Sequence, residues 1–148
     1  MISNLNFSTD YDCNPRMLSP LTLAYIGDTV FDLFVREQLI RQANRPANVL
    51  HKLSAQRVCA ASQSYAARLL IERELLSDEE LSVLKRGRNA HSHHLPKNAT
   101  ESDYHLATGL EALFGFLYLS ERSDRLHELF SIITEIHNEK FSEVDKLS

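Results

Sequence analysis

The chain has 148 residues, 43% of them hydrophobic and 24% charged, with a formal net charge of −4 at pH 7. This length fits one compact domain, and the four glycines and four prolines exclude a collagen-like or disordered chain. No apolar run reaches the ~20 residues of a membrane span, and the N-terminus does not resemble a signal peptide. Cys13 and Cys59 do not make a disulfide framework, so we expect a cytoplasmic protein. Taken alone, the negative charge argues against a nucleic-acid binder.

Apolar residues recur at spacings of three and four, which predicts an all-α fold. We expect an irregular segment at 1–18, one helical domain at 19–141 and a C-terminal tail at 142–148. Capping residues, helix breakers and periodicity together place the helices within the domain. The expected helical regions are 19–42, 48–74 (as one helix or two), 77–87, 100–120 (capped by Thr100 or Ser102) and 123–141 (capped by Ser123). The polar segment 88–99 is expected to be a loop.

The charges are distributed unevenly along the chain. Residues 38–71 and 81–100 contain no acid, and the two stretches together hold nine basic residues. The other 94 residues hold 7 basic and 20 acidic side chains. Such segregation can produce a basic face on an acidic molecule, which suits a polyanionic ligand. The alternative is that these basic residues pair with acids elsewhere in the fold.

The helix expected at 19–42 is apolar around most of its circumference, so we expect it to be central and buried. Asp28 shares a stripe with Ala24 and Phe31, where an ionised carboxylate is costly unless it is paired or holds a metal ion. Gly27 beside it costs roughly 1 kcal/mol relative to alanine in a helix interior. The two residues together predict that another group approaches this backbone closely and meets a negative charge.

The helix expected at 100–120 repeats this pattern. Glu111 is the only acid within residues 105–118, and Gly109 and Gly115 stand nearby. Two such helices can cross and bring the two carboxylates together, which suits Mg²⁺ with its preference for oxygen ligands. We therefore predict Asp28 and Glu111 as metal ligands and catalytic residues. For each acid the alternative is a structural hydrogen bond or a salt bridge.

Other chemistries have less support. The sequence has no Glu-x-x-His motif of a di-iron bundle, no glycine-rich phosphate loop and no nucleophile elbow. His91, His93 and His94 could ligate zinc, but no cysteine or fourth ligand accompanies them at motif spacing. Asp32 stands four residues before Arg36, so an exposed ion pair explains it.

Three motifs occur in order over roughly residues 18–129. They are LAYIGDTVFDLFVR at 23–36, KRGRNA at 85–90 followed by PKN at 96–98, and EALFG at 111–115 followed by YL at 118–119. Together they resemble the catalytic domain of the ribonuclease III family, and most closely its Mini-ribonuclease III branch.

The resemblance implies a helical catalytic domain that dimerises through a helical interface and binds double-stranded RNA between two subunits. It implies Mg²⁺-dependent hydrolysis that leaves 5′-phosphate ends, with Asp28 and Glu111 as the metal-binding acids. In this branch the substrate is the 23S (large-subunit) ribosomal RNA precursor, and whether a ribosomal protein delivers it stays open. The motif at 85–98 carries over as the RNA-binding set, which is Lys85, Arg86, Arg88, Asn89 and Lys97.

The chain departs from full-length ribonuclease III at two acidic positions, which are Ala24 and Thr108 here. The Mini branch shares this loss, so the number of metal ions is open. A non-catalytic module that binds double-stranded RNA on the same fold is the alternative function, and retention of both Asp28 and Glu111 argues against it.

Overall fold

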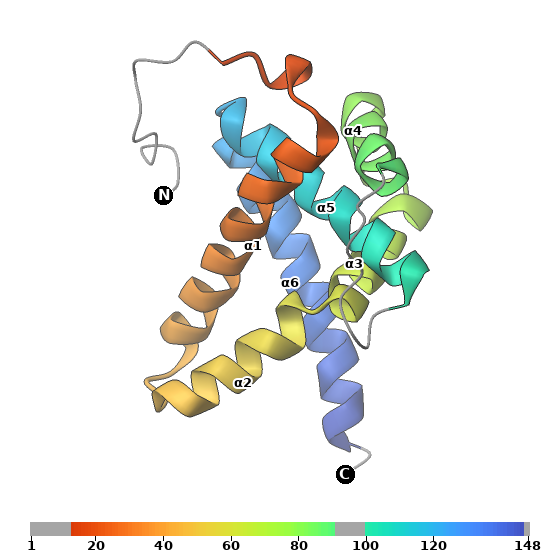
Figure 1. Cartoon of the computed structure of the whole chain (residues 1–148). Coiled ribbons are helices and arrows are strands. Elements are labelled where there is room, and N and C mark those ends of the chain that lie inside the picture. The colour runs from red at the N-terminus through yellow and green to blue at the C-terminus, as the bar shows by residue number, and fades with distance from the viewer. Residues whose placement is uncertain (1–12, 91–99, 147–148) are drawn as a thin grey trace.

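The computed structural model describes residues 13–90 and 100–146, and within these ranges it has helices and no strands. This confirms the all-α prediction. Figure 1 shows α5 running through the middle of the molecule, with α1 on one side, α3 and α4 on the other, and α6 behind. The elements in chain order are η2 (Pro15–Met17), α1 (Pro20–Gln42), α2 (Ala47–Val58), α3 (Ala60–Glu72), α4 (Asp78–Asn89), α5 (Glu101–Leu119) and α6 (Ser123–Lys146).

Capping side chains begin three of the helices as expected. The Ser19 hydroxyl accepts a hydrogen bond from the Thr22 N–H at 3.2 Å, and Thr100 caps α5 by accepting from the Asp103 N–H at 3.1 Å. At α4 the capping box is complete, because the Glu80 N–H donates to the Ser77 hydroxyl and the Ser77 N–H donates to the Glu80 carboxylate. These bonds satisfy amide groups that lack partners within a helix.

Of the two forms expected for the region 48–74, the structure has the one with two helices, because the backbone is extended at Cys59 (ψ 157°). Two other helix ends differ from the expected ones. The fourth helix passes Gly87 and ends at Asn89, since Gly87 keeps a helical conformation and packs against α5 instead of ending the helix. The last helix includes Ser123 and continues to Lys146, beyond the expected end at 141. Residues 142–146 contain no glycine or proline that would stop it.

The central helix is α5 and not α1. It contacts α1, α3, α4 and α6, and every residue from Leu106 to Leu110 and from Ala112 to Leu117 is buried. Phe114 on α5 packs edge-on against Phe31 of α1, with ring centroids 5.4 Å apart. The expectation that this helix, α1, is the central buried one is wrong, because one of its faces lies outside the core and leaves Tyr25 84% exposed.

Glycine pairs bring α5 into close contact with two neighbours. A Cβ atom added to Gly27 of α1 would overlap the carbonyl oxygen of Glu111, and one added to Gly115 would overlap the carbonyl oxygen of Leu23. At the α4 crossing, a Cβ atom on Gly87 would lie 2.9 Å from the Cα atom of Gly109. Each pair lets two helix backbones touch, which side chains would prevent.

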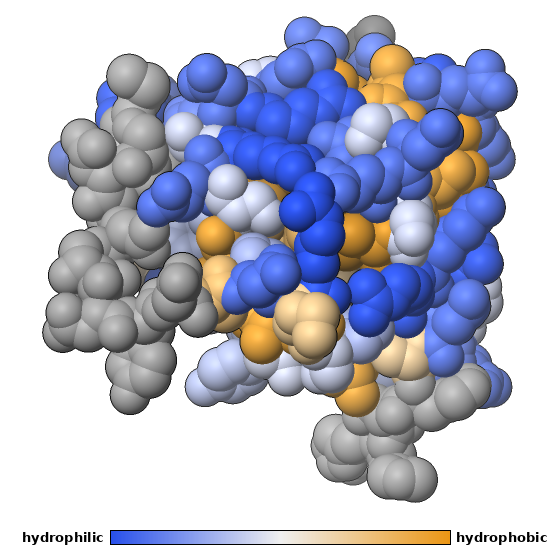
Figure 2. Space-filling model, turned by 90° about the horizontal axis from the view of Figure 1, so that it is seen from above, coloured by the Kyte–Doolittle hydropathy of each residue, from blue (hydrophilic) through white to orange (hydrophobic). Residues whose placement is uncertain are grey.

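A network of ion pairs joins η2, α4 and the start of α6 at the upper end of the molecule in Figure 1. Arg16 of η2 and Arg122, the residue before α6, both bind Glu79 of α4, each with a closest approach of 2.7 Å. Figure 2 shows hydrophilic side chains crossing this end, with apolar groups between them. Within the described part of the chain, no helix combines the length and the apolar character needed to cross a membrane.

Candidate active site

The crossing of α1 and α5 places Asp28 beside Glu111. Gly27 lies directly against the Glu111 backbone, so the next residue, Asp28, lies at the point of closest approach. The two carboxyl groups lie within hydrogen-bonding reach of each other. The sequence predicted that another group approaches the Gly27 backbone, and in the structure this group is the backbone that carries the second acid.

Burial raises the pKa of Glu111, and the hydrogen bond and negative charge of Asp28 raise it further, to about 9. With no cation present, Glu111 therefore holds a proton at pH 7. Two carboxyl groups in such contact cannot both ionise at neutral pH without a positive charge nearby. The electrostatics of the pair thus favour a bound cation.

The two acids lie in an open groove with a volume of about 700 Å³. Ala24 and Thr108 also line this groove. They are the two positions at which the resemblance places a departure from the acids of full-length ribonuclease III. The Thr108 hydroxyl donates to the carbonyl oxygen of Tyr104 at 2.9 Å. The other described lining residues all carry hydroxyl or apolar side chains, namely Leu21, Thr22, Tyr25, Ile26, Thr29, Tyr104 and Leu119.

The predicted burial of Asp28 is wrong. Its residue is exposed, whereas Glu111 is only partly exposed. At 100° per residue, Asp28 falls at the border between the face of α1 that packs on α5 and the face left uncovered. The cost of burying a charge therefore applies to Glu111, and Asp28 is open to the groove.

The donor set of the groove fits a hard divalent cation. Among the described residues its ionisable ligands are two carboxyl groups, and no described histidine or cysteine lines it. Oxygen donors of this kind suit Mg²⁺, which is commonly held by one or two carboxylates while water and substrate phosphate complete its shell. Within residues 13–90 and 100–146, no group of three or more His, Cys, Asp or Glu residues is placed to hold a metal ion. A cation here would therefore keep several positions for water or substrate.

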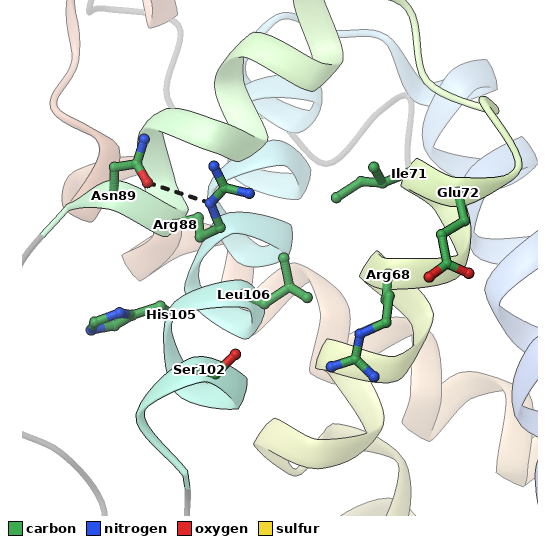
Figure 3. Close-up of a pocket in the computed structure, with 8 residues that line it drawn as sticks. All are labelled: Arg68, Ile71, Glu72, Arg88, Asn89, Ser102, His105 and Leu106. Carbon is green, nitrogen blue, oxygen red and sulfur yellow. Dashed lines mark hydrogen bonds between the residues drawn. The ribbon is translucent and has the colours of Figure 1, made fainter.

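The predicted RNA-binding residues lie on two sides of α4. Lys85, Arg86 and Asn89 line a shallow hollow of about 300 Å³ on one side. Arg88 points to the other side, into a pocket between α3 and α5 that Asn89 also borders (Figure 3). Because Arg88 and Asn89 belong to α4, the helix sets their directions. Lys97 and the three histidines at 91, 93 and 94 lie outside the described residues.

Two side-chain assignments have definite outcomes. Asp32 and Arg36 form the expected i,i+4 ion pair, at 3.1 Å. Of the basic residues in the acid-free stretch 38–71, Arg41 pairs with Glu37 at 3.0 Å and Arg68 contacts Asp103 at 3.7 Å. The alternative of pairing with acids thus holds for part of this stretch. Arg68 also lines the pocket of Arg88, and the sequence analysis did not single it out, since the two lie 20 residues apart.

Comparison with known proteins defines the class of this fold and site. The family model described as Ribonuclease III domain matches residues 21–122, which include both acids and the α4 motif. A crystal structure of a protein from Fusobacterium nucleatum superimposes with a TM-score of 0.73 at 28% identity, covering 82% of this chain and 96% of that one.

Curated relatives narrow this class. The chain is 43% identical to Mini-ribonuclease 3 of Staphylococcus aureus, over 87% of its own length and 96% of the relative's. It is 40% identical to the Clostridium tetani protein of the same name, over 84% of its own length and 82% of the relative's. It is 38% identical to the one from Enterococcus faecalis, over 78% of its own length and 88% of the relative's. The chain therefore belongs to the ribonuclease III family, in its Mini-ribonuclease 3 branch, and is an endoribonuclease.

Proposed function

We propose that this endoribonuclease cleaves double-stranded RNA with Mg²⁺ and leaves 5′-phosphate and 3′-hydroxyl ends. The observation that carries the proposal is the contact between Asp28 and Glu111 in an open groove. Asp28 and Glu111 would hold the ion, which would lower the pKa of a bound water and offset charge on the scissile phosphate. We assign no general base, because the groove offers no obvious one.

The protein side of this chemistry consists of holding and orienting. Asp28 and Glu111 are carried on two helices whose backbones touch at Gly27, so their separation is set by the core and not by a loop. The lysines and arginines of α4 would bind backbone phosphates. Since duplex RNA is recognised mainly by shape and phosphate contacts, we expect weak sequence preference and a steep dependence on salt.

We propose further that the active form is a homodimer. Four large apolar side chains of α1 are exposed, and helical geometry places them within one face of the helix. They are Leu21, Tyr25, Leu33 and Ile40. Leu21 and Tyr25 also line the groove, so a second subunit on this face would stand beside the active site. This agrees with a duplex lying between two subunits.

Cleavage of a long RNA duplex tests the proposal. We expect cutting with Mg²⁺, none with EDTA, and a loss of at least a hundredfold in Asp28→Asn and in Glu111→Gln while both variants still bind the duplex. Asp32→Asn is the matched control, because Asp32 lies on the same helix and only pairs with Arg36. Binding without cutting in the native protein would support the non-catalytic module instead.

The natural substrate that we propose is the 23S ribosomal RNA precursor, in the cytoplasm, with or without a ribosomal protein. Mapping the precursor ends in a strain that lacks this protein tests it. We expect extended ends, restored by the native gene and not by Glu111→Gln. Mature ends in the deletion strain would contradict this substrate.

A further inference from the structure

A second concave site lies on the other side of α5 from the acid groove. It is a pocket of about 630 Å³ where α3, the end of α4 and the start of α5 meet (Figure 3). Ser102, His105 and Leu106 of α5 line it, whereas Tyr104, Thr108 and Glu111 of the same helix line the acid groove. In the part of the chain that the structure describes, the two sites share no lining residue, so they can bind different parts of one ligand.

Two arginines from different helices enter this pocket. Figure 3 shows Arg68 of α3 and Arg88 of α4 on either side of Leu106, which lies between them. Leu106 is 8% exposed and with Ile71 gives the pocket an apolar floor. An apolar surface beside a guanidinium reduces solvent screening, so a charged ligand is bound more strongly there than on an open surface.

Neither arginine is tightly engaged. Arg68 lies 3.7 Å from Asp103 and 3.4 Å from the Ser64 hydroxyl, and its side chain is 50% exposed. The Arg88 guanidinium donates to the Asn89 side chain at 3.4 Å. By contrast, Arg125 binds Glu80 at 2.8 and 2.9 Å, as expected of an arginine with a structural role. Long, exposed contacts contribute little and are readily exchanged for a better acceptor.

The ligand that fits is a phosphate group. Guanidinium groups bind phosphate oxygens through paired N–H donors, and the start of α5, which borders the pocket, carries the positive partial charge of a helix N-terminus. The acids at this site, Glu72 and Asp103, exclude a strongly basic pocket, so a lone small anion would bind weakly. A phosphate on a long polymer is favoured, because its other contacts hold it in place.

We propose that Arg68 and Arg88 bind a backbone phosphate of the RNA duplex, at a point remote from the bond that is cut. This inference rests on the proposed function. It makes Arg68 a residue that positions the substrate without taking part in the chemistry. Arg68 should therefore affect KM and RNA affinity, and leave kcat nearly unchanged.

The test compares Arg68→Ala with Arg73→Ala in the full chain. Arg73 is also exposed, at the end of α3, but it does not line the pocket. In a Glu111→Gln background, where the RNA is not cut, we expect Arg68→Ala to raise the Kd for a 40-base-pair duplex about five- to tenfold and to lower the salt slope by about one. Arg68→Lys should keep the salt slope and lose part of the affinity, since lysine lacks the guanidinium fork.

With Glu111 intact, Arg68→Ala should raise KM by a similar factor and change kcat less than twofold. Equal effects of Arg68→Ala and Arg73→Ala, or a fall in kcat alone, would overturn the inference. Calorimetry with inorganic phosphate distinguishes a phosphate of the RNA from a free phosphate. If phosphate binding is lost in Arg68→Ala while the RNA affinity of this variant is unchanged, the pocket binds free phosphate instead. A native protein that neither binds nor cuts duplex RNA would refute the proposed function itself.

Discussion

Gly27 in α1 lies against the carbonyl oxygen of Glu111 in α5, with no room for a methyl group between them. This contact decides how near Asp28 comes to Glu111, because Asp28 is the next residue on α1. The same residue pair thus sets both the packing of the two helices and the geometry of the site.

We expect Gly27→Ala to lower the free energy of unfolding by about 2 kcal/mol. Alanine gains roughly 1 kcal/mol in helix propensity, but the added Cβ meets backbone atoms, and overpacking of a core costs about 1–3 kcal/mol or more. Urea denaturation measures the loss, and cleavage should fall with it as the acids separate. Gln42→Ala, exposed at the end of the same helix, is the control, and a Gly27→Ala protein as stable as the native one would contradict the prediction.

Glu111→Gln should stabilise the cation-free protein at alkaline pH. The folded-state pKa of Glu111, about 9, lies above its ordinary value of 4.5, so the stability that its protonated form contributes is complete below 4.5 and is lost as pH rises toward 9. In EDTA we expect the Tm of the native protein to fall between pH 6 and 9 by a few degrees more than that of Glu111→Gln.

At pH 8, magnesium should make the native protein more stable than Glu111→Gln, the reverse of the order expected in EDTA. A ligand that binds only the folded state raises its stability, so Mg²⁺ should raise the Tm of the native protein and leave Glu111→Gln nearly unchanged. Equal Mg²⁺ effects on the two proteins would remove Glu111 from the metal site. Because it is a Tm measurement, this experiment does not depend on cleavage.

Arg125→Met should destabilise the fold by about 3 kcal/mol at pH 7, because it leaves a buried carboxylate unpaired. Glu80 has a side chain only 4% exposed and binds Arg125 through both oxygens. Burial alone would raise the pKa of Glu80, but the hydrogen bonds from Arg125 and Ser77 outweigh it and hold this pKa below its usual value. The contribution of the Arg125–Glu80 pair to stability is therefore complete above the unfolded-state pKa of Glu80 and is lost as pH falls through its folded-state pKa.

Chemical denaturation at pH 7 and pH 3 tests this prediction. The difference in the free energy of unfolding between the native protein and Arg125→Met should be smaller at pH 3 than at pH 7. Arg16→Ala is the comparison, since the Arg16–Glu79 pair is well exposed and should contribute little to the stability of the fold. A difference in the free energy of unfolding that does not depend on pH would mean that Arg125 acts through its apolar packing.

Charges placed on the uncovered face of α1 should separate the subunits. Leu33 and Ile40 are 44% and 63% exposed and lie outside the acid groove, so Leu33→Glu and Ile40→Glu leave the groove residues intact. Light scattering after gel filtration should give the mass of a dimer for the native protein and of a monomer for the double variant. Ser131→Glu, which adds a charge to an exposed position of α6, should remain dimeric, and a native monomer would refute the dimer.

Local signals in the sequence were sufficient for much of the fold. Ser19, Ser77 and Thr100 each supply a capping oxygen within three residues of the amide they bind, so their effect is visible without knowledge of the rest of the chain. The end of α4 was misplaced for the opposite reason. Gly87 has the composition of a helix stop, but a contact with α5, which begins 14 residues later, keeps it helical.

The sequence by itself determined which side chains could perform the chemistry. A lone Asp28 beside Gly27 and a lone Glu111 near Gly115 are unfavourable in apolar helices unless something requires them, and this holds for any arrangement of the helices. Only the tertiary structure decided that Asp28 is open to solvent while Glu111 is partly buried. It also placed Arg68 in the pocket of Arg88. Exposure and contact between distant residues depend on how helices cross. The glycine contacts that fix these crossings join residues that are separated by 21 to 92 positions in the chain.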